Sequence, residues 1–255
     1  MNVDDVRLLK GVRKITVLTA YDYQTAKIID AAGIDMILVG DSIGMVVLGY
    51  EDTKKVTMKD MIRHTQAVAR AVKSAIIVGD LPIHSYRTVE EALDSAGQLM
   101  EAGAHAVKLE GDKFDIVEAL IEGGIPVQGH LGLLPQTAQN MKVRGKRRSE
   151  AHQILADARK LDYLGVFSLV LECIPLGLAR RITEAVETPT IGIGAGVCCD
   201  GQVLVVNDML GMDEGYCPRH AHAYIDLNDL IGKAVESYIE DVKSGKFPAD
   251  RHSFH

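Results

Sequence analysis

The chain has 255 residues, a formal net charge of −7, 47% hydrophobic and 25% charged residues, and no tryptophan. This length and ordinary globular composition suit one large α/β domain. The acidic balance and the lack of a long basic run argue against a nucleic-acid-binding protein. No apolar run is long enough to cross a membrane.

The cysteines of the chain show no pattern of a disulfide framework. The four of them, Cys173, Cys198, Cys199 and Cys217, include no CxxC pair, the spacing that would point to a metal or redox site. The N-terminal residues 1–5 are acidic and lack the apolar segment of a signal peptide. We therefore expect reduced thiols and a cytoplasmic protein.

Strand-like and helix-like patterns alternate along the chain. Apolar runs typical of buried parallel strands predict strands at 15–20, 35–39, 75–79, 104–109, 125–129, 166–171, 190–193 and 202–206. Helical patterns between them predict helices at 23–32, 57–73, 88–103, 114–121, 149–162 and 176–186. Two of these helices begin with a capping pattern, Thr57 with Asp60 and Thr88 with Glu91.

The alternation predicts a particular fold class. Strands separated by helices form βαβ units and a parallel sheet, and eight such units in about 250 residues suit a closed (β/α)8 TIM barrel. No Pro/Ser-rich linker or shift in composition divides the chain. We therefore expect a single domain over 1–255, with an added amphipathic helix near 226–244.

Chemically active groups follow six of the strand-like runs. These groups are Asp41, Asp80, Lys108 with Glu110, His130, Glu172 and the glycine-rich segment 192–196. In a (β/α)8 barrel the carboxyl ends of all strands meet at one face, where active sites lie. We therefore expect these groups to converge in space, and we expect the protein to be an enzyme.

Three carboxylates follow the second, third and fourth predicted strands. Asp41, Asp80 and Glu110 would repel one another unless a cation lay among them, and Mg²⁺ prefers carboxylate oxygens. Gly40 and Gly79 precede the two aspartates and allow close backbone approach. The pattern predicts a metal site. The alternative is that the acids cap the following helices or pair with Lys or Arg.

Three other side chains at strand ends have a functional and a structural interpretation. Lys108 shares a strand face with Glu110 and would hold a substrate carboxylate or enolate, or form a salt bridge to Glu110 or Asp80. Glu172 ends an otherwise apolar strand and is a candidate general base, or else a buried acid with satisfied hydrogen bonds. His130 contacts the substrate or is a hydrogen-bonded structural group.

Three further motifs are less specific. The glycine-rich segment 192–196 lacks the later acid of a dinucleotide-binding fingerprint, and we interpret it as backbone space for a substrate. The basic stretch 142–148 is either a solvated loop or an anion-contacting loop at the mouth of the site. His220 and His222 have no third ligand at zinc spacing.

In this order, the motifs resemble those of the ketopantoate hydroxymethyltransferase family. The matching pieces span almost the whole chain: LTAYDY at 18–23, VGDSIGM at 39–45, HT at 64–65, GDLP at 79–82, VKLEG at 107–111, GHLGL at 129–133 with PQ at 135–136, LECIP at 171–175, DGQ at 200–202, FP at 247–248 and HSF at 252–254. So many motifs in one order make a chance match very improbable.

The resemblance implies an activity and a set of site residues. Family members are Mg²⁺-dependent (β/α)8 barrels that transfer a one-carbon unit from 5,10-methylenetetrahydrofolate to 3-methyl-2-oxobutanoate. The product is 2-dehydropantoate, an intermediate of pantothenate and coenzyme A biosynthesis. The implied metal ligands are Asp41, Asp80 and Glu110. The implied substrate-binding residues are Asp41, Ser42, Asp80, Lys108 and His130, and the implied proton acceptor is Glu172. Small-molecule substrates and a homodecamer are expected.

The chain departs from the family pattern in two places. The segment 137–142 is short, and Val197, Cys198 and Cys199 replace more polar residues. Both changes leave the one-carbon donor open between the folate and a related tetrahydropterin. Two other interpretations are a Mg²⁺-dependent 2-oxo acid lyase or mutase of the isocitrate lyase type, whose Lys-Cys-Gly-His-like loop is absent, and a ligand-binding barrel without catalysis.

Overall fold

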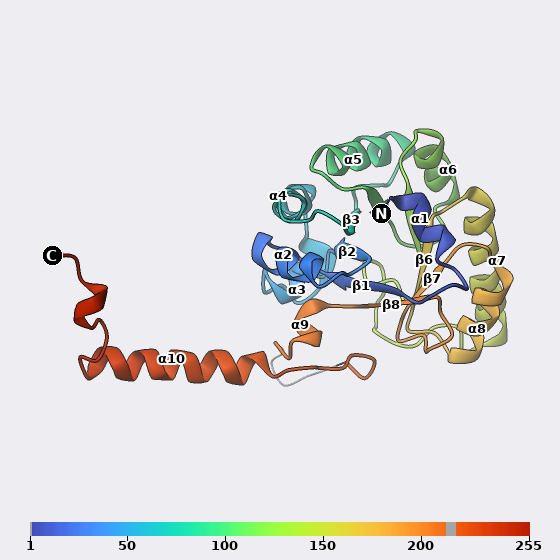
Figure 1. Ribbon diagram of the computed structural model, residues 1–255. Coiled ribbons are helices and arrows are strands. Elements are labelled where there is room, and N and C mark those ends of the chain that lie inside the picture. The colour runs from blue at the N-terminus through green and yellow to red at the C-terminus, as the bar shows by residue number, and fades with distance from the viewer. Residues whose placement is uncertain (1, 213–217) are drawn as a thin grey trace. The chain divides into compact units, whose positions relative to one another are not determined.

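The computed structural model describes residues 2–212 and 218–255, which form two compact units, Met1–Val205 and Val206–His255. The first unit is a closed barrel of eight parallel strands that follow one another in chain order (Figure 1). The strands are β1 (Ile15–Thr19), β2 (Met36–Val39), β3 (Ile76–Asp80), β4 (Ala106–Lys108), β5 (Val127–Gly132), β6 (Ser168–Glu172), β7 (Thr190–Ile193) and β8 (Gly201–Leu204). The predicted TIM barrel is confirmed.

Helices cover the outside of the barrel (Figure 1). They are α2 (Tyr23–Ala31), α4 (Met58–Ala69), α5 (Val89–Glu101), α6 (Phe114–Glu122), α7 (Arg148–Leu164) and α8 (Leu176–Ala185). The predicted caps are present, because Thr57 accepts a hydrogen bond from the Asp60 backbone and Thr88 accepts one from the Glu91 backbone. Each cap satisfies a backbone N–H that the first helical turn leaves without a partner.

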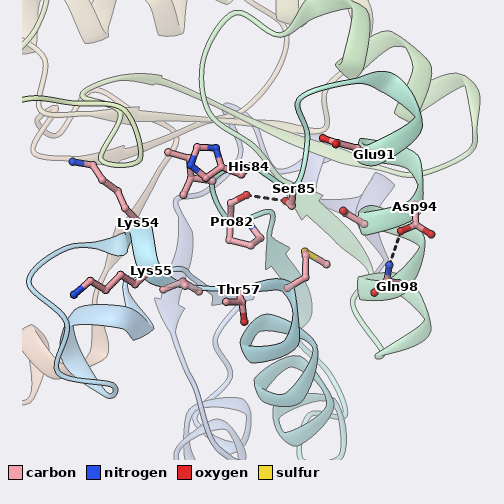
Figure 2. Close-up of a pocket in the computed structure, with 13 residues that line it drawn as sticks. Lys54, Lys55, Thr57, Pro82, His84, Ser85, Glu91, Asp94 and Gln98 are labelled. Atoms are coloured by element: carbon pink, nitrogen blue, oxygen red, sulfur yellow. Dashed lines mark hydrogen bonds between the residues drawn. The ribbon is translucent and has the colours of Figure 1, made fainter.

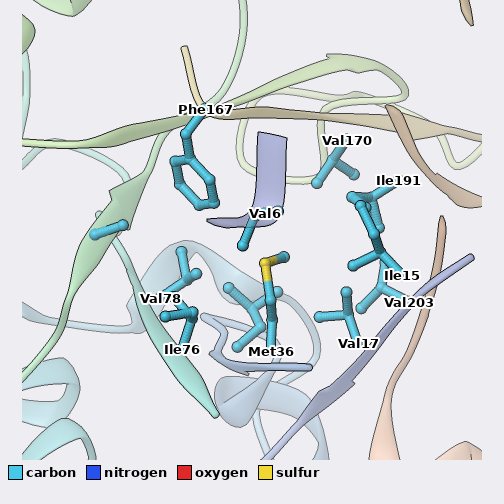
Figure 3. Packing of buried hydrophobic residues seen from close by; sticks show 12 residues of the cluster. Val6, Ile15, Val17, Met36, Ile76, Val78, Phe167, Val170, Ile191 and Val203 are labelled. Atoms are coloured by element: carbon cyan, nitrogen blue, oxygen red, sulfur yellow. The ribbon is translucent and has the colours of Figure 1, made fainter. Parts of the chain in front are cut away.

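Several short helices were not predicted: α1 (Val3–Leu8), α3 (Ile43–Val46) and the 3₁₀ turn η1 (Thr53–Lys55). The available signal for α1 was the capping box that Asn2 and Asp5 form. Val6 of α1 is fully buried and belongs to the core cluster inside the barrel (Figure 3). The N-terminal segment therefore supplies part of the core.

The barrel interior has an apolar half and a polar half. Alternate residues of a strand point to the same side, and the buried cluster contains such pairs as Ile76 with Val78 (Figure 3). Two residues further along each strand, the next position on the same side is charged. Asp80 follows Val78, Lys108 follows Ala106 and Glu172 follows Val170. The carboxyl end of the barrel is therefore where the inward positions become charged.

The second unit contains α9 (Val206–Met209), α10 (Leu227–Lys243) and the 3₁₀ turn η2 (Asp250–His252). Helix α10 lies in the segment 226–244 for which the sequence predicts a helix, and none of its residues is buried. The single-domain assignment stays a prediction. No helix in the described part of the chain has the length and apolar character to span a bilayer. Cys217 lies outside the described residues.

Candidate active site

The strand ends bring the predicted polar side chains together in neighbouring positions. Asp80 of β3 is paired with Lys108 of β4, and Gly132 of β5 is paired with Glu172 of β6. Asp80, Lys108, Glu110 and His130 are each less than 5% exposed. The predicted convergence at the carboxyl end of the barrel therefore has its structural basis in this register.

Lys108 and Asp80 form a buried ion pair at the centre of this group. The Lys108 Nζ donates to both carboxylate oxygens of Asp80 at 2.7 Å, and the backbone N–H of Asp41 donates to Asp80 Oδ2 at 3.3 Å. Burial alone would lower the pKa of Lys108, but the surrounding carboxylates of Asp80, Asp41 and Glu110 raise it above its usual value. The lysine is therefore charged, and the salt bridge to Asp80 considered from the sequence is present.

The other two carboxylates lie in an environment that disfavours their charge. Burial and the negative charge of Asp80 raise the pKa of Asp41 to about 7. Burial is also the main cause that raises the pKa of Glu110 to about 9, and Asp41 and Asp80 add to it. One lysine does not balance this many acids. The carboxylates of the site outnumber its one lysine, so the charge of the site favours binding of a further cation.

The three acids offer the donor chemistry of a magnesium site. Their carboxylate oxygens are hard ligands of the kind that Mg²⁺ prefers. Within 2–212 and 218–255, however, no three His, Cys, Asp or Glu side chains are grouped as a metal site. The Lys108 ammonium lies on both Asp80 oxygens instead. Asp41, Asp80 and Glu110 fit Mg²⁺ by donor type and charge, and their role as ligands stays a prediction.

His130 lies between two of the acids. Its Nε2 is 3.2 Å from Glu172 Oε2, and its Nδ1 is 3.6 Å from Glu110 Oε1. Neither ring nitrogen has a well-aligned hydrogen bond to a described residue. Burial lowers the pKa of His130, and the neighbouring Glu172 only partly opposes this. A neutral imidazole with unsatisfied nitrogens favours a ligand-contacting role over a purely structural one.

Ser42 is held by residues for which the sequence had suggested no role. Its hydroxyl lies 2.8 Å from the Tyr21 hydroxyl, and the Tyr21 carbonyl oxygen lies 2.5 Å from Nδ1 of His64. A side chain at Gly40 would place its Cβ 3.0 Å from the Ser42 Oγ. The glycine before Asp41 therefore leaves space for Ser42. Tyr21 and His64 were visible only as motifs of the family.

Gln136 is a second residue that sequence reasoning did not single out, and it is fully buried. Its Nε2 donates to Asp41 Oδ2 at 2.8 Å and to the Leu81 carbonyl at 2.9 Å. Its backbone N–H donates to Glu110 Oε2 at 3.2 Å, and its Oε1 accepts a hydrogen bond from the Tyr86 hydroxyl. Gln136 therefore links two of the three acids and has its amide oriented by Tyr86.

The glycine-rich segment 192–196 has a different role from the predicted one at two positions. A Cβ at Gly192 would lie 3.0 Å from the Cys199 Sγ and from the Gln202 amide. A Cβ at Gly196 would lie 2.7 Å from Leu176. Protein side chains fill both spaces. The interpretation of these two glycines as room for a substrate was wrong, because their neighbours in the fold were not visible in the sequence.

Two cavities lie among the loops that follow the strands. One, of about 470 Å³, has Lys54 and Lys55 on one side and Glu91, Asp94 and Gln98 of α5 on the other (Figure 2). The second, also of about 470 Å³, begins at Gly132, the last residue of β5. Its other lining residues are Leu134, Thr137, Ala138, Gln139, Asn140, Arg144 and Glu150.

Comparisons with known proteins agree with the motifs. A family model described as ketopantoate hydroxymethyltransferase matches residues 1–250. A 3-methyl-2-oxobutanoate hydroxymethyltransferase of Syntrophus aciditrophicus (strain SB) is 55% identical over 96% of this chain and 93% of its own length. One of Thermoanaerobacter sp. (strain X514) is 53% identical over 96% and 92%.

Solved structures show the same fold at low sequence identity. The crystal structure of phosphonopyruvate hydrolase in complex with oxalate and Mg²⁺ has a TM-score of 0.66 and 12% sequence identity. The match covers 100% of this chain and 92% of that one. At this identity the likeness indicates a shared barrel architecture and carries no information about substrate.

Proposed function

The chain belongs to the ketopantoate hydroxymethyltransferase family, and from that premise we propose how its barrel mouth carries out the transfer. The enzyme is a hydroxymethyltransferase that acts on 3-methyl-2-oxobutanoate. The single observation that carries the proposed mechanism is the buried group of Asp41, Asp80, Lys108, Glu110 and His130 beside Glu172. These side chains include carboxylates that can bind a cation and a carboxylate that can act as a base.

Asp41, Asp80 and Glu110 hold a Mg²⁺ ion. This assignment is supported by their oxygen donors and by the raised pKa values of Asp41 and Glu110, about 7 and about 9, which result first from burial and then from the neighbouring carboxylates. When bound, the ion acts as a Lewis acid toward the 2-oxo group and favours loss of the neighbouring proton. Gln136 holds Asp41 and Glu110 in place through its hydrogen bonds.

Lys108 and Ser42 bind and orient the oxo acid. An ammonium group has three N–H donors, and two contacts from Lys108 go to Asp80. The remaining donor is available to the substrate carboxylate. Ser42, held by the Tyr21 hydroxyl at 2.8 Å, offers a second polar contact at the end of β2. Fixing one end of the substrate keeps its C3 carbon aligned with the base.

Glu172 accepts the proton from C3 of the oxo acid. Its side chain is 15% exposed and lies next to the buried imidazole of His130, at 3.2 Å, so the carboxylate faces the site and stays near a neutral donor. Loss of the C3 proton leaves an enolate. His130 lies between this base and Glu110, with Nε2 beside Glu172 and Nδ1 3.6 Å from Glu110, and contacts the bound oxo acid there.

The one-carbon donor is 5,10-methylenetetrahydrofolate or a related tetrahydropterin. The enolate carbon forms a bond to the methylene carbon, and both carbon–nitrogen bonds that join this carbon to the donor break. Water supplies the hydroxyl of the product, and the two freed nitrogens take up the second proton of the water and the proton removed from C3. Tetrahydrofolate and 2-dehydropantoate are released. We propose that this reaction belongs to pantothenate biosynthesis, as the family resemblance implies.

We propose that the enzyme acts in the cytoplasm as a homo-oligomer, a decamer. Reduced thiols support the location, because Cys173, Cys198 and Cys199 are not in disulfides. Helix α10 supports association, because Leu230, Val235 and Tyr238 expose apolar surface and the helix has no buried residue. Light scattering measures the assembly, and a monomer in solution would contradict the proposal.

Detection of product by mass spectrometry tests the reaction. The protein is mixed with Mg²⁺, 3-methyl-2-oxobutanoate and 5,10-methylenetetrahydrofolate, beside the variants Asp80→Ala and Glu172→Gln. We expect 2-dehydropantoate from the wild type and none from either variant. If the wild type makes no product but exchanges the C3 proton of the oxo acid in deuterated water, the donor assignment is wrong. Absence of exchange as well would overturn the proposed mechanism.

A further inference from the structure

We infer that the cavity at the end of β5 is the binding site for the pterin ring of the one-carbon donor, with Arg144 and Glu150 as its recognising groups. This inference rests on the proposed function, in which the donor is a reduced pterin. The cavity measures about 470 Å³ and its lining runs from Gly132 to Glu150, the first acidic residue of α7. We refer to it below as the β5 cavity.

Residues in and next to the lining of the β5 cavity are hydrogen-bonded to the end of β6, the strand that carries the proposed base. Gly132, in its lining, is paired with Glu172 in the sheet, and the backbone N–H of Leu133 donates to the Glu172 carbonyl at 2.9 Å. The backbone N–H of Arg144 donates to the Cys173 carbonyl at 2.9 Å. Both sides of the cavity are therefore tied to residues 172–173. A ring bound in it lies next to the place where the enolate forms.

Two charged side chains line the β5 cavity without an ionic partner. Arg144 and Glu150 are both half-buried, and neither forms an ion pair with a residue that the structure describes. The Arg144 guanidinium makes a long contact, 3.4 Å, to the Asn140 carbonyl. Partly buried charges without partners are costly. Their cost is offset when a ligand supplies the partners.

The donor and acceptor pattern of the cavity matches a 2-amino-4-oxopterin. A carboxylate accepts hydrogen bonds only, and a guanidinium donates them only. The pterin edge has N–H donors at the 2-amino group and N3, next to an oxygen acceptor at C4. Glu150 accepts from the two N–H groups, and Arg144 donates to the oxygen. The amide side chains of Gln139 and Asn140 supply further polar contacts in the same lining.

The loop around the cavity also suits the charged end of a folate. The segment 142–148 contains Lys142, Lys146, Arg147 and Arg148 in addition to Arg144. A folate carries carboxylates on its glutamyl part, which leads away from the reacting carbon toward solvent. A basic loop at the rim attracts such an anion over a distance of about a Debye length. Of the two interpretations of the basic stretch 142–148, this inference favours the anion-contacting loop.

The cavity beside α5 does not offer the same pattern. Three of its charged side chains have partners within the chain: Lys54 pairs with Asp52 and Glu91 with Arg87, and Asp94 accepts from Gln98 at 2.7 Å (Figure 2). The ammonium of Lys55 lies over the Tyr50 ring. Glu91 and Asp94 would also repel an anionic ligand. This cavity provides the matched comparison for the test.

Binding of tetrahydrofolate and turnover by charge-neutral variants test the inference. Arg144→Gln and Glu150→Gln are compared with Lys160→Gln, which removes an exposed charge of α7 outside the cavity lining and outside the basic loop, and with Lys54→Gln in the other cavity. Calorimetric titration measures the Kd for tetrahydrofolate, and initial rates at varied concentrations of the methylene donor give its KM. Exchange of the C3 proton of 3-methyl-2-oxobutanoate without donor shows whether the oxo acid half of the site is intact.

We expect Arg144→Gln and Glu150→Gln each to raise the Kd and the KM about tenfold or more, as loss of a charged hydrogen bond does. Proton exchange stays at the wild-type rate, and the two lysine variants stay within about twofold. If all variants bind tetrahydrofolate like the wild type, or if only Lys54→Gln weakens binding, the β5 cavity is not the pterin site. A wild type that exchanges the proton but neither binds nor uses the folate overturns the donor assignment, and this inference with it.

Discussion

Nε2 of Gln136 donates a hydrogen bond of 2.8 Å to Oδ2 of Asp41. The same amide accepts a hydrogen bond from the Tyr86 hydroxyl through Oε1, and this contact determines which end of the amide faces Asp41. Burial is the main cause that raises the pKa of Tyr86 above its usual value, so the phenol keeps its proton and remains a donor. Two uncharged residues, Gln136 and Tyr86, thus orient the carboxylate of Asp41, which the sequence had identified as a candidate site residue.

Replacement of Gln136 by leucine tests this orientation. Gln136→Leu leaves the Tyr86 hydroxyl and the Leu81 carbonyl without their partners, and removes a donor from Asp41. We expect a loss of about 2–4 kcal/mol in the free energy of unfolding and at least tenfold weaker Mg²⁺ binding. Thermal denaturation and calorimetry measure the two effects.

The control for Gln136 is Gln153→Leu, because Gln153 is an exposed residue of α7 whose side chain donates to Asp157, one turn further on in the same helix. Gln153→Leu should change neither the free energy of unfolding nor the affinity for Mg²⁺ appreciably. Tyr86→Phe should weaken Mg²⁺ binding less than Gln136→Leu, since the amide keeps its contact with Asp41. Unchanged Mg²⁺ affinity in Gln136→Leu would show that the amide only fills space.

Glu172→Gln should stop the chemistry while leaving the oxo acid bound. The amide keeps the shape of the side chain but cannot accept the C3 proton. We expect proton exchange of 3-methyl-2-oxobutanoate to fall by about 10²–10⁴-fold, the usual contribution of a general base. Nuclear magnetic resonance in deuterated water measures the exchange. Glu122→Gln on the exposed end of α6 is the control, and exchange at the wild-type rate in Glu172→Gln would remove Glu172 from the mechanism.

The affinity for Mg²⁺ should increase as the pH rises from 7 to 9. Burial raises the pKa of Asp41 to about 7 and that of Glu110 to about 9 in the metal-free protein, and each carboxyl group must lose its proton to bind a cation. Calorimetric titration at several pH values measures the trend. Asp41→Asn should flatten the lower part of the curve. An affinity independent of pH would argue that neither acid is a ligand.

The same groups predict how metal removal affects stability. Their folded-state pKa values are higher than in the unfolded chain, so the stability that protonation contributes is complete below the ordinary pKa of about 4. It is lost as the pH rises through 7 and then 9. The melting temperature with a chelator should therefore fall over this interval relative to the protein with Mg²⁺. Equal melting temperatures at pH 9 would contradict the prediction.

Gly132→Ala should damage the site through backbone displacement. A Cβ at Gly132 would lie 2.2 Å from the Glu172 carbonyl oxygen, and the residue has a φ of 103°. We expect a loss of about 3 kcal/mol in the free energy of unfolding and loss of most activity. Gly165→Ala is the matched control, because its φ is 93° and no atom lies within 4 Å of the added Cβ. Equal effects of the two would mean that backbone strain alone is responsible.

Asp30→Asn should destabilise the fold without changing the chemistry. The Asp30 carboxylate accepts hydrogen bonds from the backbone N–H groups of Lys73, Ser74 and Ala75, just before β3. Burial opposes the charge of Asp30, but these donors lower its pKa below the usual value. We expect a loss of about 1–3 kcal/mol at pH 7, which disappears as the pH falls below about 4, where the wild-type group also takes up a proton. Chemical denaturation at the two pH values measures it.

The alternation of strand-like and helix-like segments in the sequence was enough to predict the barrel fold and several candidate site residues at its strand ends. Apolar runs with helical segments between them predict parallel strands, and closure then assigns every strand end to one face. Asp80, Lys108 and Glu172 were found in this way because each is the last residue of its strand, in phase with the inward-facing core. Their positions follow from local alternation and need no knowledge of distant contacts.

Tertiary contacts between distant segments decided the rest. Gln136 and Asp41 are 95 residues apart in the chain, and Tyr86 is 50 residues from Gln136, so no local pattern brings them together. Likewise the space beside Gly192 is filled by Cys199 and Gln202 across the turn into β8. Hydrogen-bond direction and the filling of space depend on which side chains meet after the barrel closes, and a strand's own sequence does not contain that information.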